Sequence, residues 1–188
     1  ILERNEIEFS AIRQKRGLPL LRLVNLSEFD HPTIQELIDH PGVRTLIPEP
    51  KYSAFPVSAG SIDGAVVSDY LSPHPELPIV AVFDTGVSPV AVTIAPWVTS
   101  HETYVVPPDT RYEHGTMVSS LVSGANHLNN GHTWIPNTRS RVHDVCGLEE
   151  NGSYTYDLIF RVTDAVAKRP DIKIWNLSIG GGPCDQNM

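Results

Sequence analysis

The order of apolar and polar positions predicts strands that alternate with helices along most of the chain. Short runs of apolar and β-branched residues predict strands at residues 18–26, 43–47, 79–84, 141–148 and 172–179. Apolar residues at helical spacing predict helices at residues 32–40, 113–125 and 154–168. Because strands alternating with helices are typical of βαβ units, we expect an α/β fold with a mostly parallel sheet flanked by helices.

The same pattern divides the chain into three parts. Residues 1–55 begin with a polar stretch and continue as strand, helix and strand, which predicts a small α+β unit. Residues 56–77 combine Gly, Ser and Pro with little periodicity and predict a linker. Residues 78–188 hold the larger α/β part, in which residues 88–108 are expected to be loop-like, with a short strand at residues 103–106.

Composition and charge narrow the classes of partner. The chain has 188 residues and a formal net charge of −8, which argues against nucleic acid or an anionic membrane as a partner. No run of about 18 apolar residues predicts a membrane-spanning helix. The two cysteines, Cys146 and Cys184, are too few for a disulfide framework. They can pair, but two unpaired and mostly buried thiols are the simpler interpretation.

Two side chains form a candidate acid–base pair. Asp84 ends the most apolar predicted strand, and the carboxyl ends of parallel strands are where ligands bind in open α/β sheets. His114 lies at the start of a predicted helix. A buried carboxylate that accepts an imidazole N–H fixes the tautomer and the orientation of the ring. Taken singly, an Asp-Thr-Gly turn or a histidine at a helix start can serve capping alone, but the combination favours chemistry.

Three motifs in the larger part resemble those of one enzyme family. Asp84-Thr85-Gly86 is similar to the aspartate motif of the subtilisin-like serine peptidases, and His114-Gly115-Thr116 to their histidine motif. Asn176-Leu177-Ser178, followed by glycines, resembles the substrate-binding strand of the same family. The resemblance covers about residues 78–183 and implies an incomplete subtilisin-like domain.

The resemblance implies a role for each matched residue. Asp84 would orient His114, and His114 would be the general base for a nucleophile and then the acid for the leaving amine. The backbone of Ser178, Ile179 and Gly180 would pair with an extended peptide or protein substrate as an added strand. The expected function is therefore hydrolysis of peptide bonds by an Asp-His-Ser triad.

The sequence also departs from the family pattern. The family's nucleophile lies in a Gly-Thr-Ser motif beyond the substrate strand, after an oxyanion asparagine, and the chain up to Met188 carries neither. We therefore expect this chain alone to be inactive, either as the N-terminal part of a larger peptidase or as a piece completed by a partner chain that supplies the C-terminal remainder. The alternative is a non-catalytic binding or structural module derived from such a peptidase. A secreted or periplasmic location fits the family, although no signal peptide opens the chain.

Two further expectations concern the first unit and metals. The helix followed by Pro41-Gly42-Val43 resembles the second half of the inhibitory propeptide of many subtilases, which implies that this unit assists folding and covers the substrate strand until removed. Residues 128–131 resemble a calcium loop of some subtilases, but the segment that follows is shorter and Thr93 stands where a carboxylate can serve. We predict no cofactor, and we expect His127, His132 and His143 to be solvated rather than metal ligands.

Overall fold

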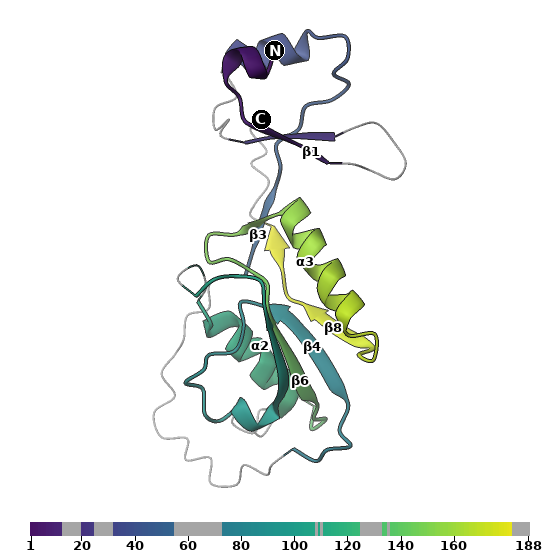
Figure 1. Ribbon diagram of the computed structural model, residues 1–188. Helices are drawn as coiled ribbons and strands as arrows, with labels where there is room; N and C mark the ends of the chain where they lie inside the picture. The colour runs from purple at the N-terminus through teal and green to yellow at the C-terminus, as the bar shows by residue number, and fades with distance from the viewer. Residues whose placement is uncertain are drawn as a thin grey trace. The chain divides into compact units, whose positions relative to one another are not determined.

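The chain divides into two compact units, which are described separately. The computed structural model describes residues 1–12, 20–24, 32–54, 73–107, 109, 111–124, 133–134 and 136–181 (Figure 1). The first unit spans Ile1–Pro48 and the second spans Glu49–Met188. The predicted linker at residues 56–77 lies largely outside the described residues.

The first unit combines a short antiparallel sheet with one helix. It contains the 3₁₀-helix η1 (Glu3–Asn5), strands β1 (Phe9–Ile12) and β2 (Leu20–Leu23), and helix α1 (Pro32–Ile38). Strands β1 and β2 pair antiparallel. Helix α1 buries Ile34 and Leu37. These elements form a small α+β unit.

One predicted strand of the first unit does not form. Residues 43–50 have no regular structure, although residues 43–47 were expected to be extended and paired. The amide of Val43 instead donates to the carbonyl of His40, which closes a turn through Pro41 and Gly42. A short apolar run becomes a strand only where a neighbouring strand takes up its hydrogen bonds, and here none of the described strands does so.

The second unit is built on a four-stranded parallel sheet. Its order is β5-β6-β4-β8, and each neighbouring pair runs parallel. The strands are β4 (Ile79–Asp84), β5 (Val98–Thr103), β6 (Arg141–Cys146) and β8 (Ile174–Leu177). The predicted mixed α/β architecture with a parallel sheet is thus confirmed at this level.

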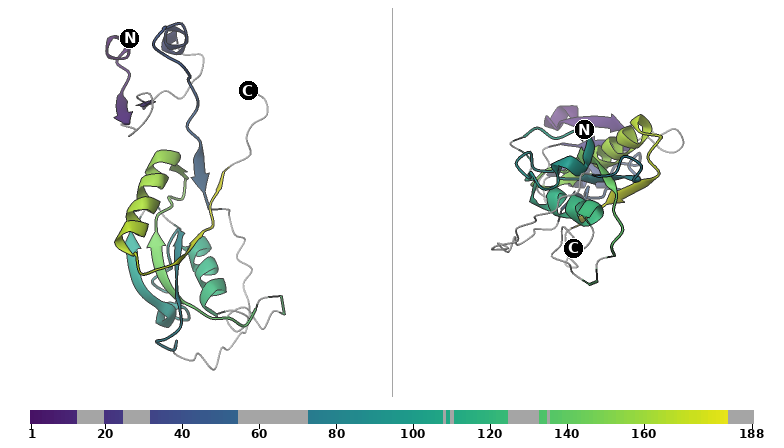
Figure 2. Two further views of the ribbon diagram at one scale, coloured as in Figure 1. Left: turned by 90° about the vertical axis from the view of Figure 1, so that its right-hand side faces the viewer. Right: turned by 90° about the horizontal axis from the view of Figure 1, so that it is seen from below.

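Helices cover both faces of this sheet, as the left view of Figure 2 shows. Helix α2 (Glu113–Gly124) packs on one face, where Val82 and Val142 contact Val118. Helix α3 (Thr155–Lys168) packs on the other, where Phe83 and Val145 belong to a cluster with Leu158 and Ala165. Successive residues of β4 and β6 serve opposite faces, which explains why both strands are buried along most of their length.

A second, smaller sheet brings together segments far apart in the sequence. Strand β3 (Lys51–Ser53) lies between β7 (Ser153–Tyr154) and β9 (Gly180–Gly181) and is antiparallel to both. Strand β3 therefore belongs to the second unit, which begins at Glu49, ahead of the boundary expected after residue 55.

The connection between β4 and α2 differs from expectation. The 3₁₀-helix η2 (Ala95–Trp97) leads into β5, which spans Val98–Thr103. The strand therefore lies earlier in the chain than residues 103–106, where the sequence predicted it. Trp97 and Ile94 pack there with Val87. Among the residues that the structure describes, no helix has the length and apolar content needed to span a membrane.

Candidate functional site

Asp84 and His114 lie in direct contact at the carboxyl end of the sheet. The Nδ1 atom of His114 is 2.8 Å from Oδ1 and 2.9 Å from Oδ2 of Asp84. The side chain of Asp84 is fully buried, and that of His114 is 12% exposed. Because a carboxylate only accepts, Nδ1 donates, and Nε2 is left as the basic nitrogen of the neutral ring. The pair thus has the geometry needed for proton transfer through Nε2.

The glycines of the two motifs allow the strand end and the helix start to touch. Gly86 has φ +86°, a conformation that favours glycine, and directly follows Thr85. A Cβ atom on Gly115 would lie 2.4 Å from the carbonyl oxygen of Gly86, so any larger residue would push the two segments apart. The Oγ1 atom of Thr85 accepts the amide of Gly115 at 3.0 Å. The small residues of both motifs therefore position Asp84 against His114.

The turn that follows Asp84 is held from several sides. The Thr85 amide donates to Oδ1 of Asp84 at 2.7 Å, and the Ser88 amide donates to Oγ1 of Thr116 at 2.9 Å. The thiol of Cys146 donates to the carbonyl of Thr85 at 3.2 Å. These contacts fix the carboxylate relative to β6 and α2.

The predicted substrate-binding residues follow β8, the neighbour of β4. Phe83 pairs with Leu177 in the sheet, so Ser178 lies one residue past that pair, as Asp84 does on β4. The Ser178 hydroxyl donates to Oδ1 of Asn176, and Gly180 pairs with Ser53 of β3. None of the described contacts of Ser178, Ile179 or Gly180 reaches Asp84 or His114.

Sequence reasoning missed a second Asp–His pair on the same face. Nδ1 of His101 is 2.6 Å from Oδ2 of Asp144, and their side chains are 51% and 1% exposed. Burial raises the pKa of Asp144, the Val87 amide and His101 oppose the rise, and the charge of Asp84 adds to it. The available signal was an aspartate inside an otherwise buried strand, a position that needs specific partners.

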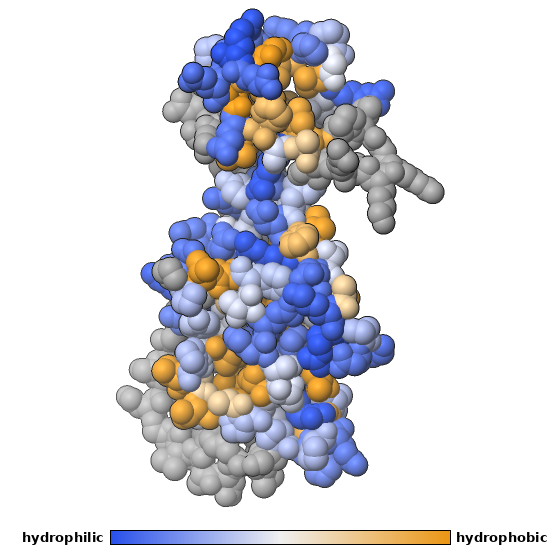
Figure 3. Space-filling model, viewed as in Figure 1, coloured by the Kyte–Doolittle hydropathy of each residue, from blue (hydrophilic) through white to orange (hydrophobic). Residues whose placement is uncertain are grey.

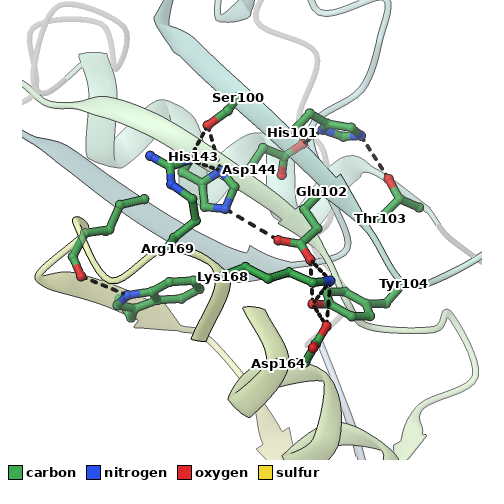
Figure 4. A network of polar contacts seen from close by, with 12 residues as sticks. Ser100, His101, Glu102, Thr103, Tyr104, His143, Asp144, Asp164, Lys168 and Arg169 are labelled. Atoms are coloured by element: carbon green, nitrogen blue, oxygen red, sulfur yellow. Dashed lines mark hydrogen bonds and ion pairs between the residues drawn. The ribbon is translucent and has the colours of Figure 1, made fainter. Parts of the chain in front are cut away.

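The opposite face of β5 carries a dense ionic network, drawn in Figure 4. Lys168 Nζ lies 2.7 Å from Oε1 of Glu102 and 2.6 Å from Oδ2 of Asp164. The Tyr104 hydroxyl lies within hydrogen-bond distance of both carboxylates and can donate its one proton to either of them. Burial raises the pKa of Tyr104, and its hydrogen bonds to the two carboxylates raise it further. These groups satisfy one another and join β5 to α3.

His143 is buried, so the expectation that it is solvated was wrong. Its side chain is 3% exposed, because β6 is covered on both faces. Its Nδ1 lies 2.8 Å from Oγ of Ser100, and its ring meets Trp175 edge to face (Figure 4 shows its surroundings). Burial and the charge of Arg169 lower the pKa of His143, which favours the neutral ring. His143 is therefore part of the core.

The described residues bear on only part of the metal and cysteine expectations. There, no group of three or more His, Cys, Asp or Glu side chains could hold a metal ion. The expected calcium-loop residues 128–131 lie outside the described residues, as do His127, His132 and Cys184. Cys146 is buried.

Comparison with known proteins yields no relative. No protein-family model matches the chain, and no curated protein or solved structure is significantly similar to it.

Proposed function

We propose that this chain is the aspartate- and histidine-bearing part of a subtilisin-like serine endopeptidase. The observation that carries the proposal is the contact of His114 Nδ1 with the fully buried carboxylate of Asp84, 2.8 Å apart. The motif resemblance adds the expected order of roles. In this proposal the nucleophilic serine and the oxyanion asparagine would be supplied by further polypeptide or by a partner chain.

The proposed chemistry uses both ring nitrogens of His114. Asp84 accepts the Nδ1 proton and keeps the ring oriented, so Nε2 can take the proton of a serine hydroxyl as that oxygen attacks the peptide carbonyl. The buried carboxylate stabilises the imidazolium that forms. Nε2 then returns the proton to the leaving amine, and water repeats the sequence to release the acyl group.

Strand β3 supports a peptide as the ligand. Tyr52 pairs with both Ser153 and Gly181, so an extended segment already fills the gap between β7 and β9. A substrate would use the same backbone groups of the edge that contains Ser178, Ile179 and Gly180. We propose that β3, which lies within the segment 1–55 expected to be propeptide-like, occupies this edge as an internal inhibitor.

Fluorophosphonate labelling tests the proposal. The full-length gene product and the 188-residue chain are treated side by side, together with a His114→Ala variant of the long form. We expect only the unaltered long form to label, because losing the serine costs on the order of a millionfold in turnover. The proposal fails if the long form does not label.

A binding module is the second candidate, favoured by the free side of β8. In the described sheet β8 pairs only with β4, and its Ile174 and Leu177 are exposed. Hydrophobic side chains reach the surface of the second unit in several places (Figure 3). Such an edge accepts a strand from another chain. A long form that binds a partner chain without labelling would support this function.

A further inference from the structure

The strongest unexplained feature is the carboxylate of Asp144, buried behind the turn of the Asp84 motif. Its Oδ2 accepts the Val87 amide at 3.0 Å and lies 2.6 Å from Nδ1 of His101. Its Oδ1 is buried and has no hydrogen-bond partner among the described residues. A buried carboxylate with one unsatisfied oxygen reduces stability. An apolar residue would fit the surrounding strand better, so the carboxylate calls for a reason other than folding.

The contacts of Asp144 lead to the candidate site. Val87 ends the turn that begins at Asp84, and its amide is anchored to β6 only through Asp144 among the described hydrogen bonds. The same turn contacts α2, where Gly115 and Thr116 bind it next to His114. Asp144 thus holds the turn at Val87, whereas Asp84 and Cys146 hold it at Thr85.

The charged surroundings of Asp144 come from each neighbouring element. Strand β5 contributes His101, whose Nε2 lies 3.1 Å from Oγ1 of Thr103. Strand β4 contributes Asp84, whose like charge repels that of Asp144. The start of α2 contributes His114, which contacts Asp84. His101 directly contacts Asp144, and this contact orients the carboxylate toward Val87.

We propose that Asp144 is a positioning residue for the Asp84–His114 pair, held in place by His101. It acts through the Val87 amide, which sets the path of the turn and so the direction of the Asp84 carboxylate. The catalytic meaning of this inference rests on the proposed function. The positional effect itself is a property of this chain.

The test measures the turn and the pair by NMR in the 188-residue chain. In Asp144→Ala we expect the Val87 amide to exchange with solvent about tenfold faster, since a hydrogen bond to a charged group is lost. We also expect the far-downfield line of the His114 Nδ1 proton to broaden. Asp144→Asn retains an oxygen acceptor of the same shape and should restore both signals.

A matched control separates positioning from general loss of stability. Val142→Ala removes a fully buried side chain from the same face of the same strand, without touching the turn. We expect it to lower stability while the Val87 exchange and the His114 line stay as in the unaltered chain. If Asp144→Ala does not fold, His101→Ala takes its place, with the same changes expected at smaller size.

Three results would overturn the inference. The first is equal Val87 exchange in Asp144→Ala and Val142→Ala, and the second is an unchanged His114 line in Asp144→Ala. The third is failure of Asp144→Asn to restore the signals. Absence of fluorophosphonate labelling in the long form would instead count against the peptidase proposal and leave these measurements intact.

Discussion

On the α2 face of the sheet, Asp84 engages one nitrogen of His114 and leaves the other available. On the α3 face, the carboxylate of Glu102 is bound by Lys168 and Tyr104 together. Both faces hold acids beside hydrogen-bond donors at short distance. They differ in what these contacts leave over, because no described hydrogen bond uses Nε2 of His114, whereas Glu102, Lys168 and Tyr104 are bound to one another. This difference separates a candidate site from a structural ion network.

The largest expected effect follows from replacing the Asp84 carboxylate on the α2 face of the sheet. In the long form, Asp84→Asn should reduce the rate of fluorophosphonate labelling by about ten-thousandfold, because the amide favours the wrong imidazole tautomer. Lys168→Met, on the α3 face, should leave the labelling rate within about twofold, since it alters only the network of partly exposed charges. Labelling kinetics of the two variants test this prediction. Equal losses of labelling rate in both would contradict the distinction between the two faces.

The second prediction concerns the contact between the two motifs. Gly115→Ala should lower the free energy of unfolding by about 2–3 kcal/mol, because its Cβ would collide with the backbone of Gly86. Gly42→Ala meets only the side chain of His40, at 3.0 Å, and should cost less than about 0.5 kcal/mol. Urea denaturation measures both values. A Gly115→Ala chain of unchanged stability would show that the strand end and helix start are not tightly apposed.

A third, smaller effect should appear on the α3 face. Tyr104→Phe keeps the ring and removes the hydroxyl that can donate to Glu102 or Asp164. We expect a loss of about 1 kcal/mol in unfolding free energy, since the partly exposed carboxylates keep Lys168 as a partner. Thermal unfolding measures the loss, and the labelling rate of the long form should not change. Slower labelling would link the network to the site.

The smallest expected effect is a pH dependence of the unfolding free energy that comes from Asp144 on the α2 face. Burial raises the pKa of Asp144 above its ordinary 3.8. At pH values between 3.8 and the raised pKa, the native state therefore holds a proton that the unfolded chain has released. The free energy of unfolding should therefore rise as the pH falls through this window. In Asp144→Asn this rise should be absent, and at pH 7 the variant should be at least as stable as the unaltered chain. Denaturation curves across the acidic range test the sign.

Much of the second unit follows from local pattern. The apolar run of β4 and the periodic faces of α2 and α3 predict these elements, and their order predicts the parallel sheet. The sequence also paired Asp84 with His114, because a buried carboxylate at a strand end can fix the tautomer of a histidine at a helix start. The contact at 2.8 Å agrees with that expectation.

Strand β5 shows why the rest escaped prediction. Its Glu102 faces the ion network, while His101 faces Asp144, so polar residues occupy both sides and no apolar alternation exists. Such a strand is specified by partners more than 40 residues away on β6. Asp144 was missed for the same reason, because its partners lie on other elements.

Strand β3 has a consequence for how a substrate peptide would gain access to the backbone groups of β7 and β9. Lys51–Ser53 is covalently joined to the sheet that it completes. Under the proposed function it would compete with a free peptide for these backbone groups as a tethered segment, at an effective concentration that the connecting chain sets. Dilution of the protein does not weaken this competition, whereas it weakens the binding of any free peptide. Under the proposed function, cutting or withdrawing the tether, rather than a rise in peptide concentration, would commit the molecule to turnover.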